Sequence, residues 1–318
     1  MKAAVVHNFD APPHYADFDD PSAQPGEVIV TVRAAALSHL VRGQASGRHY
    51  SSRSTLPLVP GVDGVGTLPD GRRVYFAFPR SPYGAMAEKA PVPEGHYVPV
   101  PDDLGDVAAA AIANPGMSSW AALTARAKLA PGETVLINGA TGVAGALAVR
   151  IARHLGAGRV IATGRNAARL AELPSMGADV VISLEQSEEE LARRFREEMA
   201  SVDVVLDYLW GKSAELLLTS APGSIAGAQA RRIRYVNIGA ASGGTIPLPA
   251  SALRSSGLEL LGSGLGSVSN QALIALIGDL LNAARPANLS VEAEAVPLAE
   301  VESAWHRDTG DRRLVFTV

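Results

Sequence analysis

The 318-residue sequence contains no cysteine. This absence excludes disulfide bridges, thiolate nucleophiles and every zinc site that is built with cysteine. Seven histidines are present, but none of them shows the spacing of a metal-binding motif such as H-E-x-x-H. We therefore expect no metal site in this protein.

The sequence also lacks an excess of basic residues and a long apolar run. Its 28 basic and 32 acidic residues are interspersed and give a net charge of −4, so no basic stripe indicates nucleic acid as a partner. No apolar run reaches the about 18 residues that a membrane-spanning helix needs, and the first residues contain no apolar signal region. We expect a cytoplasmic protein that binds neither nucleic acid nor membranes.

The hydrophobic content of 47% is sufficient for buried cores, and the length fits two domains. Before residue 114, short apolar runs separated by turn residues predict a region of mostly β structure. Its expected strands are residues 2–6, 28–34, 64–68, 73–78 and 97–100, with a hairpin turn at residues 69–71. Helices are expected at residues 102–113 and 118–129, and strands then alternate with helices, which predicts a parallel sheet.

One stretch, residues 134–166, organises the second half of the chain. An apolar strand at residues 135–137 ends in the turn Asn138-Gly139-Ala140-Thr141-Gly142. The helix that follows has apolar residues at the spacing of one buried face, and residues 160–163 form a second strand. This strand, turn, helix and strand of about thirty residues is typical of the phosphate-binding half of a Rossmann fold.

The glycine turn is the expected binding site for a pyrophosphate. Side chains at these positions would keep the backbone amides away from an anion that sits on the amino end of the helix. The glycines follow a G-x-x-G-x-x-G spacing instead of G-x-G-x-x-G. The residues expected to bind the cofactor here are Gly139, Thr141, Gly142, Val143, Ala144 and Gly145.

The end of the second strand predicts NADPH rather than NADH. NAD-specific sites place an aspartate or glutamate there to bind the ribose hydroxyls. This chain instead has Gly164, Arg165 and Asn166, with Arg169 one turn further on. Because a guanidinium pairs with a phosphate and no carboxylate repels it, these four residues are expected to hold the 2′-phosphate.

Several short motifs, in this order along the chain, indicate a family. They are Gly26-Glu27-Val28, residues 58–66 (LVPGVDGVG), residues 116–120 (GMSSW), the glycine turn, Gly177-Ala178-Asp179, residues 202–207 (VDVVLD), Asn237-Ile238-Gly239 and Leu314-Val315-Phe316. With them, the chain resembles the zinc-independent medium-chain dehydrogenases/reductases, specifically the branch of NADPH-dependent quinone oxidoreductases and enone reductases. The similarity extends over nearly the whole length.

The resemblance implies an α/β fold in which a Rossmann domain, a doubly wound parallel sheet, is inserted into a GroES-like β-barrel catalytic domain. Residues 1–114 plus 252–318 would form the catalytic domain, and residues 115–251 would form the NADP-binding domain. The implied reaction is hydride transfer from NADPH to a quinone or an α,β-unsaturated carbonyl. A homodimer, formed through the strand near residues 258–261, is also implied.

The resemblance further implies roles for individual residues. Ser118 would contact the nicotinamide or its ribose, although its hydroxyl also suits a helix N-cap. Gly239, Gly262 and Ser263 would let the backbone approach the nicotinamide, although the glycines also suit ordinary strand ends. The zinc enzymes of the superfamily have a cysteine near Ser38 and a histidine at the position of Val62, which predicts a reaction without metal.

The substrate-facing segment in the family matches residues 38–50 of this chain. Tyr50 is the first candidate for a hydrogen-bond donor to the substrate oxygen, because a phenol also offers its ring to a planar quinone. Ser38 is the second candidate, as a small hydroxyl donor. His39 is the third, since an imidazole exchanges a proton near neutral pH.

Two alternatives come from other protein classes. Tyr208 and Lys212 match the Y-x-x-x-K of short-chain reductases, but Gly211 would weaken a helix that places them on one face, so we interpret the match as coincidence. The glycine turn also resembles that of some redox-sensing regulators, and the chain could be a non-enzymatic NADPH-binding sensor. Such a sensor would bind NADPH without oxidising it in the presence of a quinone or an enone.

Overall fold

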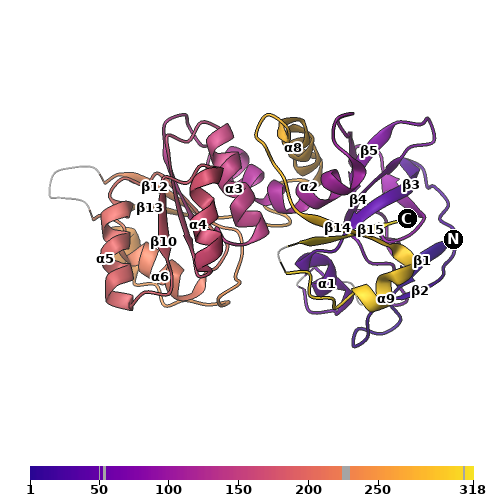
Figure 1. Cartoon of the computed structure of the whole chain (residues 1–318), viewed down its shortest axis with the longest axis horizontal. Coiled ribbons are helices and arrows are strands. Elements are labelled where there is room, and N and C mark those ends of the chain that lie inside the picture. Colours follow the sequence, from indigo (N-terminus) through magenta and orange to yellow (C-terminus); the bar gives the residue numbers. More distant parts are fainter. Residues whose placement is uncertain (50, 53–54, 224–229, 311) are drawn as a thin grey trace. The chain divides into compact units, whose positions relative to one another are not determined.

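The computed structural model describes residues 1–49, 51–52, 55–223, 230–310 and 312–318. The chain divides into two compact units. The first comprises Met1–Asn114, Asn270–Arg285 and Ser290–Val318, and the second comprises Pro115–Ser269 and Pro286–Leu289. Both ends of the chain therefore fold in the first unit (Figure 1).

A six-stranded parallel sheet forms the centre of the second unit. Its strands are β8 (Thr134–Asn138), β9 (Arg159–Gly164), β10 (Val180–Ser183), β11 (Val204–Asp207), β12 (Arg232–Asn237) and β13 (Gly257–Gly262). They lie in the order β10-β9-β8-β11-β12-β13, and every neighbouring pair is parallel. This is the doubly wound order of a Rossmann fold, which confirms the predicted fold. The direction of winding changes between β8 and β11, the switch point where ligands bind in such sheets.

Helices follow the strands of this sheet. They are α3 (Val143–His154), α4 (Ala167–Met176), α5 (Glu188–Met199), α6 (Gly211–Thr219) and the short α7 (Ala250–Arg254). Within the second unit, α3 packs beside α4 and α5 packs beside α6 (Figure 1). Strand residues such as Leu136 and Val205 pack with Phe195 of α5 in a core that excludes water. Burial of these apolar side chains is the main stabilising contribution to this unit.

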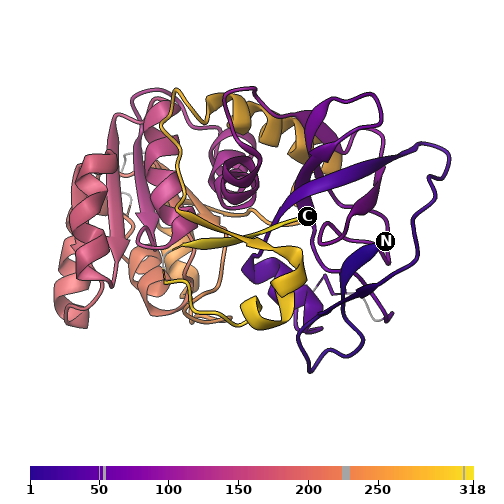
Figure 2. The same cartoon turned by 45° about the vertical axis from the view of Figure 1, so that its right-hand side comes forward.

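The first unit contains a seven-stranded sheet of mostly antiparallel strands. Its strands are β3 (Glu27–Ala36), β4 (Asp63–Thr67), β5 (Arg73–Ala77), β6 (Lys89–Pro93), β7 (Tyr97–Pro99), β14 (Ala293–Pro297) and β15 (Arg313–Thr317). The order is β14-β15-β3-β4-β5-β7, and β6 pairs with β3. A separate pair is formed by β1 (Lys2–Val5) and β2 (His14–Asp17). Because β15 pairs with β3, the unit joins both ends of the sequence, as predicted (Figure 2).

The hairpin predicted at residues 69–71 is confirmed. Strands β4 and β5 pair antiparallel on either side of it. Gly71 has a φ of +89°, and the side chain of Asp70 accepts a hydrogen bond from the N–H of Arg72 at 3.0 Å. A residue with positive φ and an Asx-type hydrogen bond are the usual means of closing such a turn.

The two helices predicted around residue 115 are one helix, so that prediction is wrong. Helix α2 (Asp106–Ala121) continues through Pro115 into the π-helix η1 (Ala122–Arg126). Proline removes one N–H donor but has a φ that suits a helix. The hydroxyls of Ser118 and Ser119 donate to the carbonyl oxygens of Pro115 and Gly116, at 2.7 and 3.1 Å, one turn back. Burial of the alanine-rich helix outweighs the missing bond.

The boundary between the units also differs from the expected one at residue 251. Strand β13 pairs with β12 along its whole length, and residues 252–269 therefore fold with the parallel sheet. Helix α8 (Asn270–Ala283) and helix α9 (Val301–Ala304) belong to the first unit. Helix α1 (His39–Ala45), also in the first unit, lies in the segment that is expected to face the substrate.

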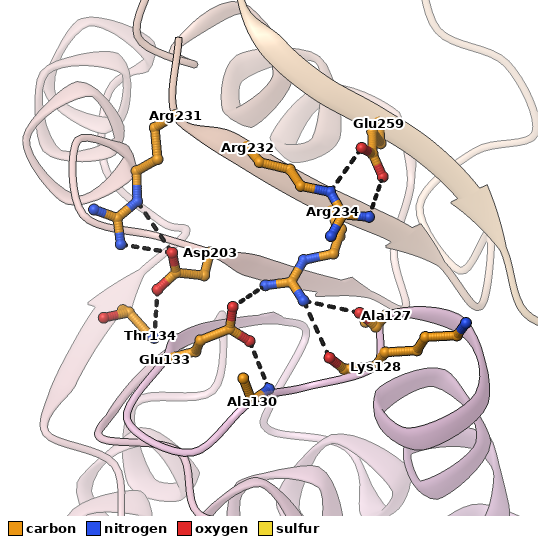
Figure 3. Close-up of polar contacts among 10 residues, drawn as sticks. All are labelled: Ala127, Lys128, Ala130, Glu133, Thr134, Asp203, Arg231, Arg232, Arg234 and Glu259. Carbon is orange, nitrogen blue, oxygen red and sulfur yellow. Dashed lines mark hydrogen bonds and ion pairs between the residues drawn. The ribbon is translucent and has the colours of Figure 1, made fainter. Parts of the chain in front are cut away.

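Ion pairs and hydrogen bonds hold the amino ends of the parallel strands (Figure 3). The guanidinium of Arg234 on β12, only 4% exposed, pairs with Glu133 and donates to the carbonyl oxygen of Ala127 at 2.8 Å. Asp203, just before β11, pairs with Arg231 at 2.6 Å. These contacts attach the end of η1 to the sheet. The glycine turn lies at the opposite, carboxyl ends of the strands.

Candidate functional site

The turn between β8 and α3 requires its glycines for different reasons. Gly139 has a φ of +96°, a region that L side chains rarely adopt. A Cβ on Gly145 would lie 2.3 Å from the carbonyl oxygen of Gly139, so this glycine lets the helix pack on the turn. A Cβ on Gly142 would meet no described atom within 4 Å. Gly142 therefore borders open space at the amino end of α3.

The first turn of α3 presents unused amides. The N–H of Ala146 donates to the carbonyl oxygen of Gly142 at 2.8 Å, the first backbone hydrogen bond of this turn. Among the described residues, the amides of Val143, Ala144 and Gly145 therefore have no intrahelical acceptor. Together with the helix dipole, they form a site that favours an anion such as a pyrophosphate.

A buried polar chain joins the carboxyl ends of three strands. The N–H of Gly139 donates to Oγ1 of Thr163 at 3.2 Å, and the Thr163 hydroxyl donates to Oδ1 of Asn138 at 2.7 Å. Nδ2 of Asn138 donates to Oδ1 of Asp207 at 2.8 Å. Asn138, Thr163 and Asp207 are fully buried. Because each polar atom has a partner, the chain fixes the turn to the ends of β8, β9 and β11.

This series of hydrogen bonds was not predicted from the sequence, although the sequence contains a signal for it. Asn138 and Asp207 are polar residues at the ends of otherwise apolar strands. In a parallel sheet such ends meet at one edge, where ligands bind. Asp207 also accepts hydrogen bonds from the N–H groups of Leu209 and Trp210, at 3.0 and 3.1 Å, and thereby shapes the turn after β11.

The residues expected to select NADPH lie together at the end of β9. Gly164 is buried, and a Cβ there would come within 2.3 Å of Cγ2 of Thr141, so Thr141 lies directly against it. Arg165 and Asn166 are exposed. Asn166 caps α4, because its Oδ1 accepts from the N–H of Arg169 at 3.0 Å. The side chain of Arg169 pairs with Glu172 at 2.8 Å, which leaves Arg165 as the more accessible guanidinium.

The residues expected near the nicotinamide also lie in the second unit. Ser118 is inside α2, so its interpretation as a helix N-cap is wrong. Gly239 follows β12, and a Cβ there would lie 2.6 Å from the carbonyl oxygen of Tyr208. Gly262 ends β13, and its carbonyl oxygen accepts from Nε of Arg126 at 2.8 Å. The N–H of Ser263 donates to the carbonyl oxygen of Asn237 at 2.8 Å, which ties this loop to β12.

Ser38 and His39 lie at the start of α1 in the first unit. Ser38 is buried and caps the helix, because its Oγ accepts from the N–H of Val41 at 3.1 Å. Among the described residues, its own hydroxyl proton has no acceptor, so it can be donated to a ligand. His39 is exposed. Tyr50 lies outside the described residues.

The match of Tyr208 and Lys212 to a short-chain reductase motif is a coincidence, as predicted. Tyr208 lies in the turn after β11, whereas Lys212 is in α6 and pairs with Glu188 at 2.8 Å and Glu215 at 3.2 Å. Desolvation raises the pKa of Tyr208 to about 12, whereas a catalytic tyrosine that a lysine activates needs a lowered pKa.

Comparison with known proteins agrees with this geometry. The family model described as zinc-binding dehydrogenase matches residues 144–279, a range that contains neither Ser38 nor Val62. The chain is 30% identical to a probable NADPH-dependent quinone reductase of Emericella nidulans, over 99% of both chains. Among solved structures, the quinone oxidoreductase of Thermus thermophilus is 29% identical and covers 100% of both chains, with a TM-score of 0.80.

A mycobacterial quinone oxidoreductase shares the fold, with a TM-score of 0.85 at 24% identity over 100% of both chains. The parallel sheet, its glycine turn and the first unit built from both chain ends occur together with a relative of matching length. The chain belongs to the quinone oxidoreductase branch of the medium-chain dehydrogenases/reductases.

Proposed function

We propose that this protein is an NADPH-dependent oxidoreductase that reduces a quinone or an α,β-unsaturated carbonyl by hydride transfer. The observation that carries the proposal is the open amino end of α3, at the switch point of the sheet, in a chain that matches a quinone reductase over 99% of its length. When bound, the cofactor supplies the hydride. The relatives include a probable quinone reductase and a quinone oxidoreductase, which favours an enzyme over the alternative of a sensor.

The residues of the second unit suit the parts of the cofactor. The amides of residues 143–145 would hold the pyrophosphate, with Thr141 and the three glycines of the turn keeping the backbone close to it. Arg165 would pair with the 2′-phosphate, supported by Gly164, Asn166 and Arg169. On the nicotinamide side we propose Ser118, Gly239, Gly262 and Ser263.

Hydride transfer to a carbonyl compound places negative charge on its oxygen, and a donor nearby stabilises that charge. We propose Ser38 and His39 as donors, because the Ser38 hydroxyl proton is available and the imidazole of His39 is exposed. Replacing Ser38 by alanine would remove both an N-cap and this donor. Ser187→Ala is the matched control, since Ser187 caps α5 in the same way, with Oγ accepting from the N–H of Glu190 at 3.3 Å.

The two serine variants separate stability from catalysis. Both should lose about 1 kcal/mol of unfolding free energy with the cap. Only Ser38→Ala should also lower kcat, by about 10² if the hydroxyl donates to the reacting oxygen. Unchanged kcat in both Ser38→Ala and His39→Ala would show that neither residue is the donor.

We propose further that the reaction needs no metal. The chain has Ser38 and Val62 where zinc enzymes of the superfamily have ligands, and no cysteine at all. Among the described residues, no group of three or more histidine, aspartate or glutamate side chains could hold a metal ion. Dialysis against a strong chelator should leave turnover unchanged. Loss of activity that zinc restores would contradict the proposal.

A turnover screen tests the function itself. NADPH oxidation, followed by its absorbance, should require a quinone or an enone and should not occur with simple aldehydes. Binding of NADPH without oxidation by any quinone or enone would support the sensor instead. Equal rates with aldehydes would point to an alcohol dehydrogenase.

We also propose a homodimer that forms through β13. This strand pairs with β12 and lies at the edge of the sheet, and Leu260 on it is 41% exposed. Such an edge can pair with the same strand of a second copy. Leu260→Glu should give monomers in sedimentation experiments. Val181→Glu, at the opposite edge on β10 and 37% exposed, is the control that should stay dimeric.

No helix in the described part of the chain is long and apolar enough to cross a membrane. The cytoplasmic location expected from the sequence stays a proposal. Cell fractionation tests it, and recovery of the protein with membranes or outside the cell would contradict it.

A further inference from the structure

Tyr208 occupies a central place at the carboxyl edge of the parallel sheet. Its N–H donates to the carbonyl oxygen of Asn138 at 3.1 Å, so it lies beside the glycine turn. Its carbonyl oxygen lies against Gly239, at 2.6 Å from the position of a Cβ there. Tyr208 is therefore placed where β8, β11 and β12 end, on the β12 side of the switch point.

The hydroxyl of Tyr208 is part of a directed hydrogen-bond chain. Oγ of Ser118 lies 2.7 Å from the carbonyl oxygen of Pro115, and a carbonyl can only accept, so Ser118 uses its single proton there. The phenol oxygen of Tyr208 lies 3.3 Å from the same Oγ. Tyr208 is consequently the donor in this pair. Ser119 also interacts with the phenol, and its own proton is directed at the carbonyl oxygen of Gly116 at 3.1 Å, so it too can only accept from Tyr208.

The direction of this chain decides what the phenol can still do. A phenol has one proton and lone pairs that accept hydrogen bonds. With its proton directed at Ser118, the phenol oxygen offers only acceptor capacity to a ligand. Because desolvation raises its pKa to about 12, the phenol stays protonated at neutral pH.

The position along the sheet indicates which part of the cofactor comes near Tyr208. The 2′-phosphate is assigned to Arg165 at the end of β9, and the pyrophosphate to the turn after β8. In the strand order, β11 and β12 lie on the other side of β8 from β9, so the nicotinamide half of a bound cofactor would extend toward them. The carboxamide group on the nicotinamide ring has N–H groups that can donate hydrogen bonds.

We propose that the phenol oxygen of Tyr208 accepts a hydrogen bond from the carboxamide N–H of the nicotinamide, and that Ser118 orients the phenol for this. The inference rests on the proposed function, since it requires NADPH at the glycine turn. It makes Tyr208 a cofactor-binding residue and Ser118 a positioning residue. Ser118, whose proton is directed at Pro115, would then act on the nicotinamide through the phenol.

The test compares two cofactors in binding experiments, without turnover. The 3-acetylpyridine analogue of NADPH has a methyl ketone in place of the carboxamide and therefore has no N–H at this point. Tyr208→Phe should raise the Kd of NADPH by about 5- to 10-fold, the worth of one neutral hydrogen bond, and leave the Kd of the analogue within about twofold. Ser118→Ala combined with Ser119→Ala removes both acceptors and lets the phenol turn and donate to a ligand. In this double variant, the Kd of the analogue divided by the Kd of NADPH should fall toward one.

Each other outcome overturns a defined statement. If Tyr208→Phe weakens both cofactors equally, or neither, the carboxamide contact is absent. If this ratio of Kd values is unchanged in the double variant, the serines do not orient the phenol. Failure of the unmutated protein to bind NADPH at all would instead remove the proposed function. Thermal unfolding of each variant shows that the fold is kept, and Tyr208→Phe changes only one oxygen atom.

Discussion

Nδ2 of Asn138 donates a hydrogen bond to Oδ1 of Asp207 across 2.8 Å. This contact joins β8 and β11, the two strands between which the direction of winding reverses. Both side chains are fully buried. Removing a partner from a buried polar group costs about 1–3 kcal/mol, and more for a charged one. Asn138→Leu should therefore lower the unfolding free energy by about 3 kcal/mol in denaturant titrations, and it should weaken NADPH binding because the turn loses its anchor.

Ser213→Ala is the matched control for Asn138. The same Nδ2 also donates to Oγ of Ser213, at 2.9 Å, but this variant leaves the contact with Asp207 intact. Ser213→Ala should lower the unfolding free energy by only about 1 kcal/mol. Equal stability of the two variants would show that the contact between Asn138 and Asp207 contributes little.

This contact shows where prediction from the sequence stops. Local signals are sufficient to predict a helix at residues 188–199, which is α5, because Ser187 caps it and acidic residues occupy its first turn. The glycine turn is likewise predicted from its local sequence. Asn138, however, meets a partner 25 residues away and another 69 residues away, and such pairing depends on strand order. Helix α2 through Pro115 likewise depends on tertiary burial, which overrides a local breaker.

Arg165 should determine the preference for NADPH. It is exposed at the end of β9, where no aspartate or glutamate follows directly. Charge-assisted hydrogen bonds are worth about 1.5–3 kcal/mol, so Arg165→Ala should raise the Kd for NADPH by about 10- to 100-fold and leave the Kd for NADH nearly unchanged. Arg196→Ala, at an exposed position on α5, loses the same charge and should change neither. If the unmutated protein binds both cofactors equally, the assignment is wrong.

Asp63 should make the stability of the first unit depend on pH. Burial raises its pKa from 3.8 to about 6, although the hydroxyl of Tyr75, which donates at 2.8 Å, and the charge of Arg313 act in the opposite direction. The folded protein thus holds this proton more tightly than the unfolded chain. Its contribution is fully present below about pH 4 and is lost as the pH rises through about 6. From pH 4 to 7, the unmutated protein should lose about 3 kcal/mol relative to Asp63→Asn.

Asp70 is the control for Asp63, because its contribution to stability should change with pH in the opposite direction. A hydrogen bond from Arg72 lowers the pKa of the exposed Asp70, so its contribution is present above the unfolded pKa and is lost on acidification. Relative to Asp70→Asn, the unmutated protein should therefore gain stability as the pH rises, and only slightly because the pair is exposed. Urea titrations at several pH values measure both differences. Parallel curves for the unmutated protein and Asp63→Asn would contradict a raised pKa.

The ion pair between Arg234 and Glu133 should matter for stability and not for cofactor binding. Arg234 is 4% exposed, and its guanidinium also donates to Ala127 and Lys128 at 2.8 and 3.3 Å (Figure 3). Replacing it with leucine would leave Glu133 and these carbonyl oxygens without their partner. Because breaking a buried pair costs about 3–5 kcal/mol, Arg234→Leu should lower the unfolding free energy by that amount.

Arg232 offers a matched comparison on the same strand. It pairs with Glu259 at 2.7 Å, but both side chains are exposed, so Arg232→Leu should lower the unfolding free energy far less than Arg234→Leu. Both arginines lie at the amino end of β12, whereas the glycine turn follows the carboxyl end of β8. The Kd for NADPH should therefore stay within about twofold of the unmutated value. It is measured under conditions in which each variant is folded. A large loss of NADPH affinity in Arg234→Leu would mean that the end of η1, which this arginine holds, transmits its position to the cofactor site.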